Sequence, residues 1–115
     1  MLTLSNPIKR GQVWYADLSP VVGSEQGGLR PVVIVQNDMG NYHAPTVIAC
    51  PLTTRVKNPL PTHATLVYGK CKGSTVLCEQ VKTLDKRRLK TFISECTEDE
   101  MARIDRALKI SLNLI

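Results

Sequence analysis

The stretch GSEQGGLRPVVIVQND, residues 23–38, decides the expected fold because a polar, glycine-rich loop leads directly into an apolar run. Residues 32–35 are β-branched and apolar, and the glycines and the proline before them disfavour a helix. This pattern predicts a buried strand over residues 32–36 that follows a turn-rich loop. Arg30 lies at the junction of the loop and the strand.

A guanidinium at such a junction is permanently charged, and its planar fork of donors matches the oxygens of a phosphate. A phosphate ligand is therefore the first interpretation of Arg30. The second interpretation is a structural ion pair with Glu25 or Asp17, since ion pairs between loop side chains are common. This segment alone leaves both interpretations open.

The length of 115 residues allows one hydrophobic core but not two, so we expect a single domain over residues 1–115. The first residues show no signal-peptide pattern, and no stretch approaches the roughly 18 apolar residues of a membrane span. We therefore expect a cytoplasmic protein that makes no membrane contact.

Four cysteines are present, and none forms a C-x-x-C pair. Three of them, Cys50, Cys78 and Cys96, have apolar or strand-like surroundings, where a free thiol behaves as a small hydrophobe. Only two histidines accompany them, and no metal-ligand spacing results. The sequence predicts reduced structural thiols, no metal site and no cofactor.

A formal net charge of +5 comes from lysines and arginines that lie mainly between the predicted strands. This distribution favours a polyanionic partner, because basic loops can converge on one face of the protein. The alternative is a solvated basic surface without a special purpose.

Several short strand patterns predict an all-β body. Besides residues 32–36, they occupy residues 13–17, 46–52, 63–68, 75–78 and 81–84. Asp85 precedes a short helical turn that it can cap. So many short strands in a small chain favour a strongly bent sheet or small barrel over a sandwich.

The C-terminal segment carries the clearest helix signal. Thr97 and Glu100 form a capping box, which places the helix start at this point. An apolar stripe at helical spacing follows, made of Met101, Ile104, Leu108, Leu112 and Ile115. We expect this stripe to pack on the barrel, with a dimer contact as the alternative, and we expect i,i+4 pairs between Asp99 and Arg103 and between Asp105 and Lys109.

Five blocks in order, KRGQVWYADLSP (9–20), GSEQGGLRPVVIVQND (23–38), PTVIACPLTT (45–54), LPTHATL (60–66) and STVLCEQVKTLDKRRL (74–89), together resemble the MazF/PemK family of toxin endoribonucleases. The likeness is nearest to family members from Gram-positive bacteria. It implies a mainly β, SH3-like small barrel of the MazF/CcdB kind, with short helices and a C-terminal α-helix.

The resemblance also implies an activity and partners. It implies a homodimer that cuts single-stranded RNA at a short sequence without a metal. Such a protein would be the toxin of a type II toxin–antitoxin system and would arrest growth. The implied partners include a small, acidic MazE-like antitoxin, and contact with DNA would occur only through this antitoxin. Two other classes remain open, namely a non-catalytic nucleic-acid-binding barrel and a CcdB-like toxin that poisons DNA gyrase.

The family motifs mark Arg30 and Thr53 as the catalytic pair. Metal-free cleavage most readily uses the 2′-hydroxyl as nucleophile, so Arg30 is expected to stabilise the phosphate and Thr53 to donate to it. Glu25 is the candidate base, and His63 is expected to be structural. The candidate RNA contacts are Ser24, Gln26, Thr54, Lys57, Glu79, Gln80 and Lys86.

Overall fold

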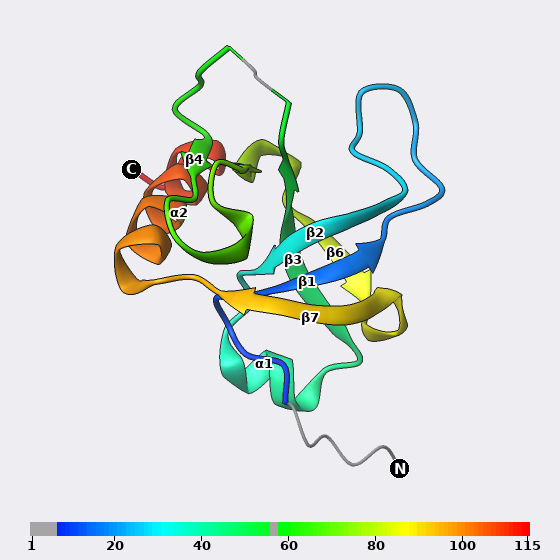
Figure 1. Cartoon of the computed structure of the whole chain (residues 1–115). Helices are drawn as coiled ribbons and strands as arrows, with labels where there is room; N and C mark the ends of the chain where they lie inside the picture. Colours follow the sequence, from blue (N-terminus) through cyan, green and yellow to red (C-terminus); the bar gives the residue numbers. More distant parts are fainter. Residues whose placement is uncertain (1–6, 56–57) are drawn as a thin grey trace.

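The structure, a computed structural model, describes residues 7–55 and 58–115. The elements of these residues, in chain order, are β1 (Gln12–Asp17), β2 (Leu29–Ile34), α1 (Asp38–His43), β3 (Thr46–Thr53), β4 (His63–Thr65), η1 (Gly69–Cys71), β5 (Thr75–Leu77), η2 (Cys78–Gln80), β6 (Lys82–Asp85), η3 (Lys86–Arg88), β7 (Leu89–Glu95) and α2 (Glu98–Ser111). The η elements are single turns of 3-10 helix. Figure 1 shows the curved strands of the sheet, with α2 against one side.

The sheet is antiparallel throughout, with the strand order β4-β5-β3-β2-β1-β7 and with β6 also paired to β3. The long strand β3 changes its partner along its length, from β6 at Thr46 to Ala49 to β5 at Leu52 and Thr53. Pro51, which cannot donate a backbone hydrogen bond, lies between these two ladders. This confirms the expected mainly β fold with a strongly bent sheet and a C-terminal helix.

Strand β2 begins at Leu29, three residues before the predicted start. Leu29 and Pro31 pair with Asp17 and Tyr15 of β1, so the hairpin partner extends the strand through residues that read as a loop. The strand β7 and the helix α1 were not predicted at all. The side chains of β7 are exposed or half-buried, and therefore produce no clear alternation in the sequence.

The predicted strand over residues 63–68 ends at Thr65. Beyond it, the backbone N–H groups of Val67 and Tyr68 donate to Glu100 Oε2, at 2.8 and 3.1 Å, rather than to a neighbouring strand. Glu100 Oε1 accepts from the N–H of Thr97 at 2.8 Å, and Thr97 Oγ1 accepts from the N–H of Glu100 at 3.1 Å, which confirms the capping box. The buried carboxylate of Glu100 thus starts α2 and fixes the turn after β4.

Helix α2 covers the main apolar cluster with Ile104 and Ala107, both almost fully buried. The predicted stripe packs on the barrel at Met101, Ile104 and Leu108, but its end is exposed, with Leu112 at 53% and Ile115 at 65%. The part of the stripe that packs on the barrel is therefore the first half.

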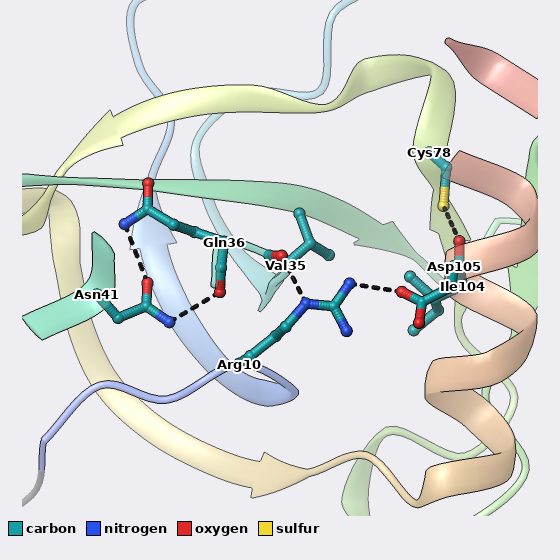
Figure 2. A network of polar contacts seen from close by, with 7 residues as sticks. All are labelled: Arg10, Val35, Gln36, Asn41, Cys78, Ile104 and Asp105. Carbon is teal, nitrogen blue, oxygen red and sulfur yellow. Dashed lines mark hydrogen bonds and ion pairs between the residues drawn. The ribbon is translucent and has the colours of Figure 1, made fainter. Parts of the chain in front are cut away.

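The expected ion pairs within α2 are wrong for the described residues. Figure 2 shows Asp105 paired with Arg10, whose Nε also donates to the Val35 carbonyl at 2.8 Å. Arg103 donates to the Thr65 carbonyl at 3.1 Å. Contacts with the barrel have replaced contacts along the helix.

All four cysteines are free: Cys50, Cys71 and Cys78 are buried, and Cys96 is half-buried. Burial, together with the nearby Glu100 and Cys71, raises the pKa of the Cys96 thiol to about 12. Such a thiol stays protonated and packs as an apolar group. Among the described helices, none is both long and apolar enough to cross a membrane.

Candidate active site

The loop between β1 and β2, residues 18–28, projects from one end of the sheet (Figure 1). It borders a cleft of about 300 Å³ together with one residue from β2 and one from the connection after β3. The lining residues are Gly23, Ser24, Glu25, Gln26, Gly27, Arg30 and Arg55. We call this the arginine cleft.

Arg30 reaches the cleft from the first residues of β2 and is half-buried. Its Nε donates to the Gly27 carbonyl at 2.9 Å. Among the described residues it forms no ion pair, since the carboxylates of Asp17 and Glu25 accept instead from backbone N–H groups of the β1–β2 loop. The structural ion-pair interpretation of Arg30 is therefore wrong, and its two terminal nitrogens remain for a ligand.

Thr53 is the last residue of β3 and lies at the same end of the sheet. The pairs Val32 with Pro51 and Ile34 with Ala49 set a register that, continued by two residues, places Arg30 opposite Thr53. Thr53 is only 2% exposed, and its Oγ1 accepts from the N–H of Arg55 at 3.2 Å. Its hydroxyl hydrogen is left to donate.

Arg55 is a cleft residue that the sequence reasoning did not single out. It is exposed, and it lies beside Arg30 and the β1–β2 loop. The available signal was its place two residues after Thr53, within the basic segment that follows the family threonine. Two guanidinium groups against the one carboxylate of Glu25 make the cleft electropositive, which suits an RNA phosphate.

Glu25 occupies the tip of the β1–β2 loop, where its Oε1 accepts from the N–H of Val22 at 2.9 Å. It lines the arginine cleft and also a second cleft of about 360 Å³ that it shares with Glu79, Gln80 and Lys82. The loop thus forms the wall between the two hollows. The exposed Glu25 carboxylate faces both.

Glu79 and Gln80 form the turn η2 beside the loop. Glu79 accepts from Thr62 Oγ1 at 3.0 Å and lies 3.0 Å from His63 Nε2. Burial opposes the ionisation of Glu79, but hydrogen bonds from its own backbone, His63 and Thr62 outweigh that effect and lower its pKa. His63 is thus held by a carboxylate, which fits a structural role.

The remaining candidate RNA contacts are dispersed. Thr54 is exposed beside the cleft, and Lys57 lies outside the described residues. Lys86 lies at the far end of β3, because Asp85 pairs with Thr46, and its Nζ donates to the Asn41 carbonyl. The eight residues of β3 separate it from Thr53 by roughly 23 Å, so within one chain Lys86 does not line the arginine cleft.

Comparisons with known proteins identify the family of the chain. The model of the PemK-like, MazF-like toxins of type II toxin–antitoxin systems matches residues 9–112. The chain is 49% identical to the Endoribonuclease EndoA of Bacillus subtilis (strain 168) over 112 residues, which cover 94% of this chain and 97% of the relative.

Solved structures show the same fold. MazF from Deinococcus radiodurans superposes with a TM-score of 0.84 at 27% identity, over 95% of this chain and 99% of that one. An endoribonuclease in complex with its cognate antitoxin, from a mycobacterial species, superposes with a TM-score of 0.82 at 30% identity, over 94% and 97% of the two chains.

Proposed function

Because the chain belongs to the PemK-like, MazF-like family of toxins of type II toxin–antitoxin systems, we propose that it is an endoribonuclease that cuts single-stranded RNA at a short sequence. The observation that carries the proposal is the arginine cleft, where Arg30 offers terminal guanidinium nitrogens that no described carboxylate occupies. The relative from Bacillus subtilis, which is named an endoribonuclease, supports the reaction class.

The reaction we propose is attack of the 2′-hydroxyl on the adjacent phosphorus. The O2′–P bond forms as the P–O5′ bond breaks, which leaves a 2′,3′-cyclic phosphate and a 5′-hydroxyl. The protein must remove the 2′ proton, stabilise extra negative charge on the phosphate and protonate the departing 5′-oxygen. The positive charge for this step can come from the protein itself, so we propose that no metal is required.

We propose that Arg30 stabilises the phosphate and supplies a proton to the leaving group. Donors already aimed at developing charge are worth roughly 2.7–4 kcal/mol each by analogy with oxyanion holes. Thr53 would donate its hydroxyl hydrogen to a phosphoryl oxygen from its fixed position at the end of β3. Glu25 is the candidate base, because it is the carboxylate that lines the same cleft as Arg30.

The RNA path we propose runs from the arginine cleft across the β1–β2 loop to η2. Ser24 and Gln26 lie on the loop, Thr54 flanks the cleft, and Glu79 and Gln80 border the second hollow. Arg55 would hold the phosphate next to the one that is cut. Lys86 stays as a proposed contact with a more distant part of an RNA chain, and Lys57 stays as a proposed RNA contact.

We propose a cytoplasmic homodimer whose partner is a small antitoxin with an acidic segment. A net charge of +5 attracts such a segment, and an acidic chain that folds along the RNA path competes with RNA. In the mycobacterial structure, an endoribonuclease of this fold is in complex with its cognate antitoxin. The antitoxin should protect RNA, and its affinity should fall as salt concentration rises.

The test is incubation of the purified chain with single-stranded RNA in excess EDTA. Cuts at a short sequence that end in a 2′,3′-cyclic phosphate are expected. Binding without cuts would instead indicate a nucleic-acid-binding barrel, and trapping of DNA gyrase would indicate a gyrase poison. Either result would end the nuclease proposal.

A further inference from the structure

The β1–β2 loop is fastened to the turn η2 by one side chain, that of Gln80. Its Oε1 accepts from the N–H of Gln26 at 2.9 Å, and its Nε2 lies 3.4 Å from the Ser24 carbonyl, to which it donates. A side-chain amide carries an acceptor and a donor side by side, so it can hold two backbone groups of one loop at once.

The same short piece of loop also holds Arg30. Gln26 is bonded to Gln80 through its N–H, and the next residue, Gly27, accepts from Arg30 Nε through its carbonyl at 2.9 Å. The position of Gln80 therefore fixes that of Gly27, and Gly27 fixes the Nε of Arg30. Because Nε–H is occupied, the donors that remain for a ligand are those of the two terminal nitrogens.

The base of this chain of contacts is rigid. The N–H of Cys78 donates to the Thr62 carbonyl at 3.0 Å, and Glu79 is bonded to Thr62 and His63. Cys78 itself is fully buried in the main core. Gln80 thus extends from a fixed turn, as a residue must if it is to position a neighbour.

A buried side chain of the β1–β2 loop, that of Gln26, disfavours the conformation of the loop. Gln26 is only 9% exposed, and its side-chain Oε1 is a buried polar atom without a hydrogen-bond partner among the described residues. An unsatisfied buried acceptor opposes the conformation that contains it. The two bonds from Gln80 act against this tendency of the loop to leave its place.

We propose that Gln80 is a positioning residue that holds the β1–β2 loop so that Arg30 is aimed before RNA binds. This inference rests on the proposed ribonuclease function and gives Gln80 a role besides RNA contact, because its amide is bonded to the loop through both its oxygen and its nitrogen. Its effect falls on the rate of cleavage. The affinity for RNA should change less than the rate, because the guanidinium groups of Arg30 and Arg55 remain present when the loop is released.

The experiment uses Gln80→Met, which keeps the length of the side chain and removes both bonds, and Gln80→Glu, which keeps the acceptor for Gln26. Hydrogen exchange of the Gln26 N–H and the Arg30 Nε–H is followed by NMR without RNA. In Gln80→Met both protons should exchange about tenfold faster or more, and in Gln80→Glu that of Gln26 should stay protected. Thr83→Val, an exposed change on β6, is the matched control and should leave exchange unchanged.

Cleavage of a single-stranded RNA oligonucleotide is measured on the same variants. We expect kcat of Gln80→Met to fall about 10- to 100-fold with KM within twofold, since small misplacement of a catalytic group lowers the rate strongly. Gln80→Glu should keep most of kcat, with a higher KM from its negative charge.

Unchanged exchange of Gln26 in Gln80→Met would overturn the positioning role, and so would a loss confined to KM. Absence of cleavage by the unmodified chain would end the proposed function instead. In that case the exchange of Gln26 and Arg30 still decides whether Gln80 holds the loop.

Discussion

Arg30 stands opposite Thr53 when the register of β2 and β3 is continued to the ends of the two strands, yet the two side chains differ in depth. Arg30 is half-buried and lines the arginine cleft, whereas Thr53 is 2% exposed and held by the N–H of Arg55. The Arg30 guanidinium therefore lines the arginine cleft directly, whereas the buried Thr53 is not among the lining residues of the cleft.

Arg30→Ala and Thr53→Ala should each lower the rate of RNA cleavage by on the order of 10²–10³, because both side chains are proposed to act on charge that develops in the transition state. Thr53→Val keeps the branched shape of the buried residue and should lower the rate of RNA cleavage by a similar factor. Single-turnover cleavage of an oligoribonucleotide measures the rate, and thermal unfolding verifies that each variant is folded. Affinity for RNA should change much less than the rate.

Arg30→Lys keeps the charge and loses the planar fork, so it should remain strongly impaired if two phosphoryl oxygens are held at once. The double variant of Arg30 and Thr53 should be little slower than the slower single variant, as expected for groups that serve one step. Full activity of a folded Arg30→Ala protein would contradict the mechanism.

Arg55→Ala should weaken RNA binding and reduce the slope of log K against log salt by about 1, because one phosphate contact is lost. The N–H that Thr53 accepts belongs to the Arg55 backbone and survives the substitution. The rate at saturating RNA should therefore change little. Lys109→Ala, an exposed change of equal charge on α2, is the control, and an equal salt slope in the two variants would refute the contact.

Glu100→Gln should make the stability of the protein less dependent on pH below neutrality. Burial opposes the ionisation of Glu100, but hydrogen bonds from the N–H groups of Thr97, Val67 and Tyr68 outweigh that effect and keep its pKa below the ordinary 4.5. The folded state therefore favours the carboxylate, and its contribution is complete above pH 4.5 and lost as the pH falls toward the lowered pKa.

Urea unfolding between about pH 7 and pH 3 measures this effect. At pH 7 the Gln variant should be less stable by about 1.5–3 kcal/mol, the usual range for hydrogen bonds to a charged group. The difference in stability between the unmodified protein and Glu100→Gln should become smaller as the pH falls. A difference that stays constant over this range would show that the charge of Glu100 does not matter.

Asp105→Asn should cost less than about 1 kcal/mol, because the ion pair between Asp105 and Arg10 is partly exposed and exposed pairs contribute little. Arg10→Ala should cost more, since it also leaves the Val35 carbonyl without the bond from Nε. Thermal unfolding of the single and double variants forms the cycle that separates the two contributions. Equal losses for the two single variants would contradict this assignment.

Local signals in the sequence were sufficient for some elements. Thr97 and Glu100 fix the start of α2 through atoms three residues apart, and Asp85 caps η3 by accepting from the N–H of Arg87, as predicted. Both features depend on neighbours in the chain. No distant partner is needed to form them.

Other features depend on partners that the sequence does not place. Strand β7 exists because it pairs with β1, and the early start of β2 also depends on β1. Likewise, Asp105 has a helix neighbour of opposite charge at the expected spacing, but Arg10 reaches it from the other end of the chain. Distant pairing outweighs local preference at these positions.

The residues of the site likewise fall into those that the sequence identifies and those that only distant contacts reveal. The family motifs named Arg30 and Thr53, and the register of β2 and β3 brings them to one end of the sheet. The motifs could not show that Gln80 is bonded to the β1–β2 loop or that Arg55 lines the arginine cleft together with Arg30, because these contacts join separate loops. Nor could charge alone reveal that Lys86 is tied to Asn41 at the far end of β3.

The place of α2 in the fold has a consequence for synthesis in the cell. The helix closes the core with Ile104 and Ala107, and Glu100 satisfies the turn after β4. All described strands leave the ribosome before this helix, so the apolar side of the nascent barrel stays exposed to solvent until α2 is synthesised. A chain that stops before α2 should be a substrate for chaperones and proteases, and the cell should meet no active enzyme until translation has passed the helix.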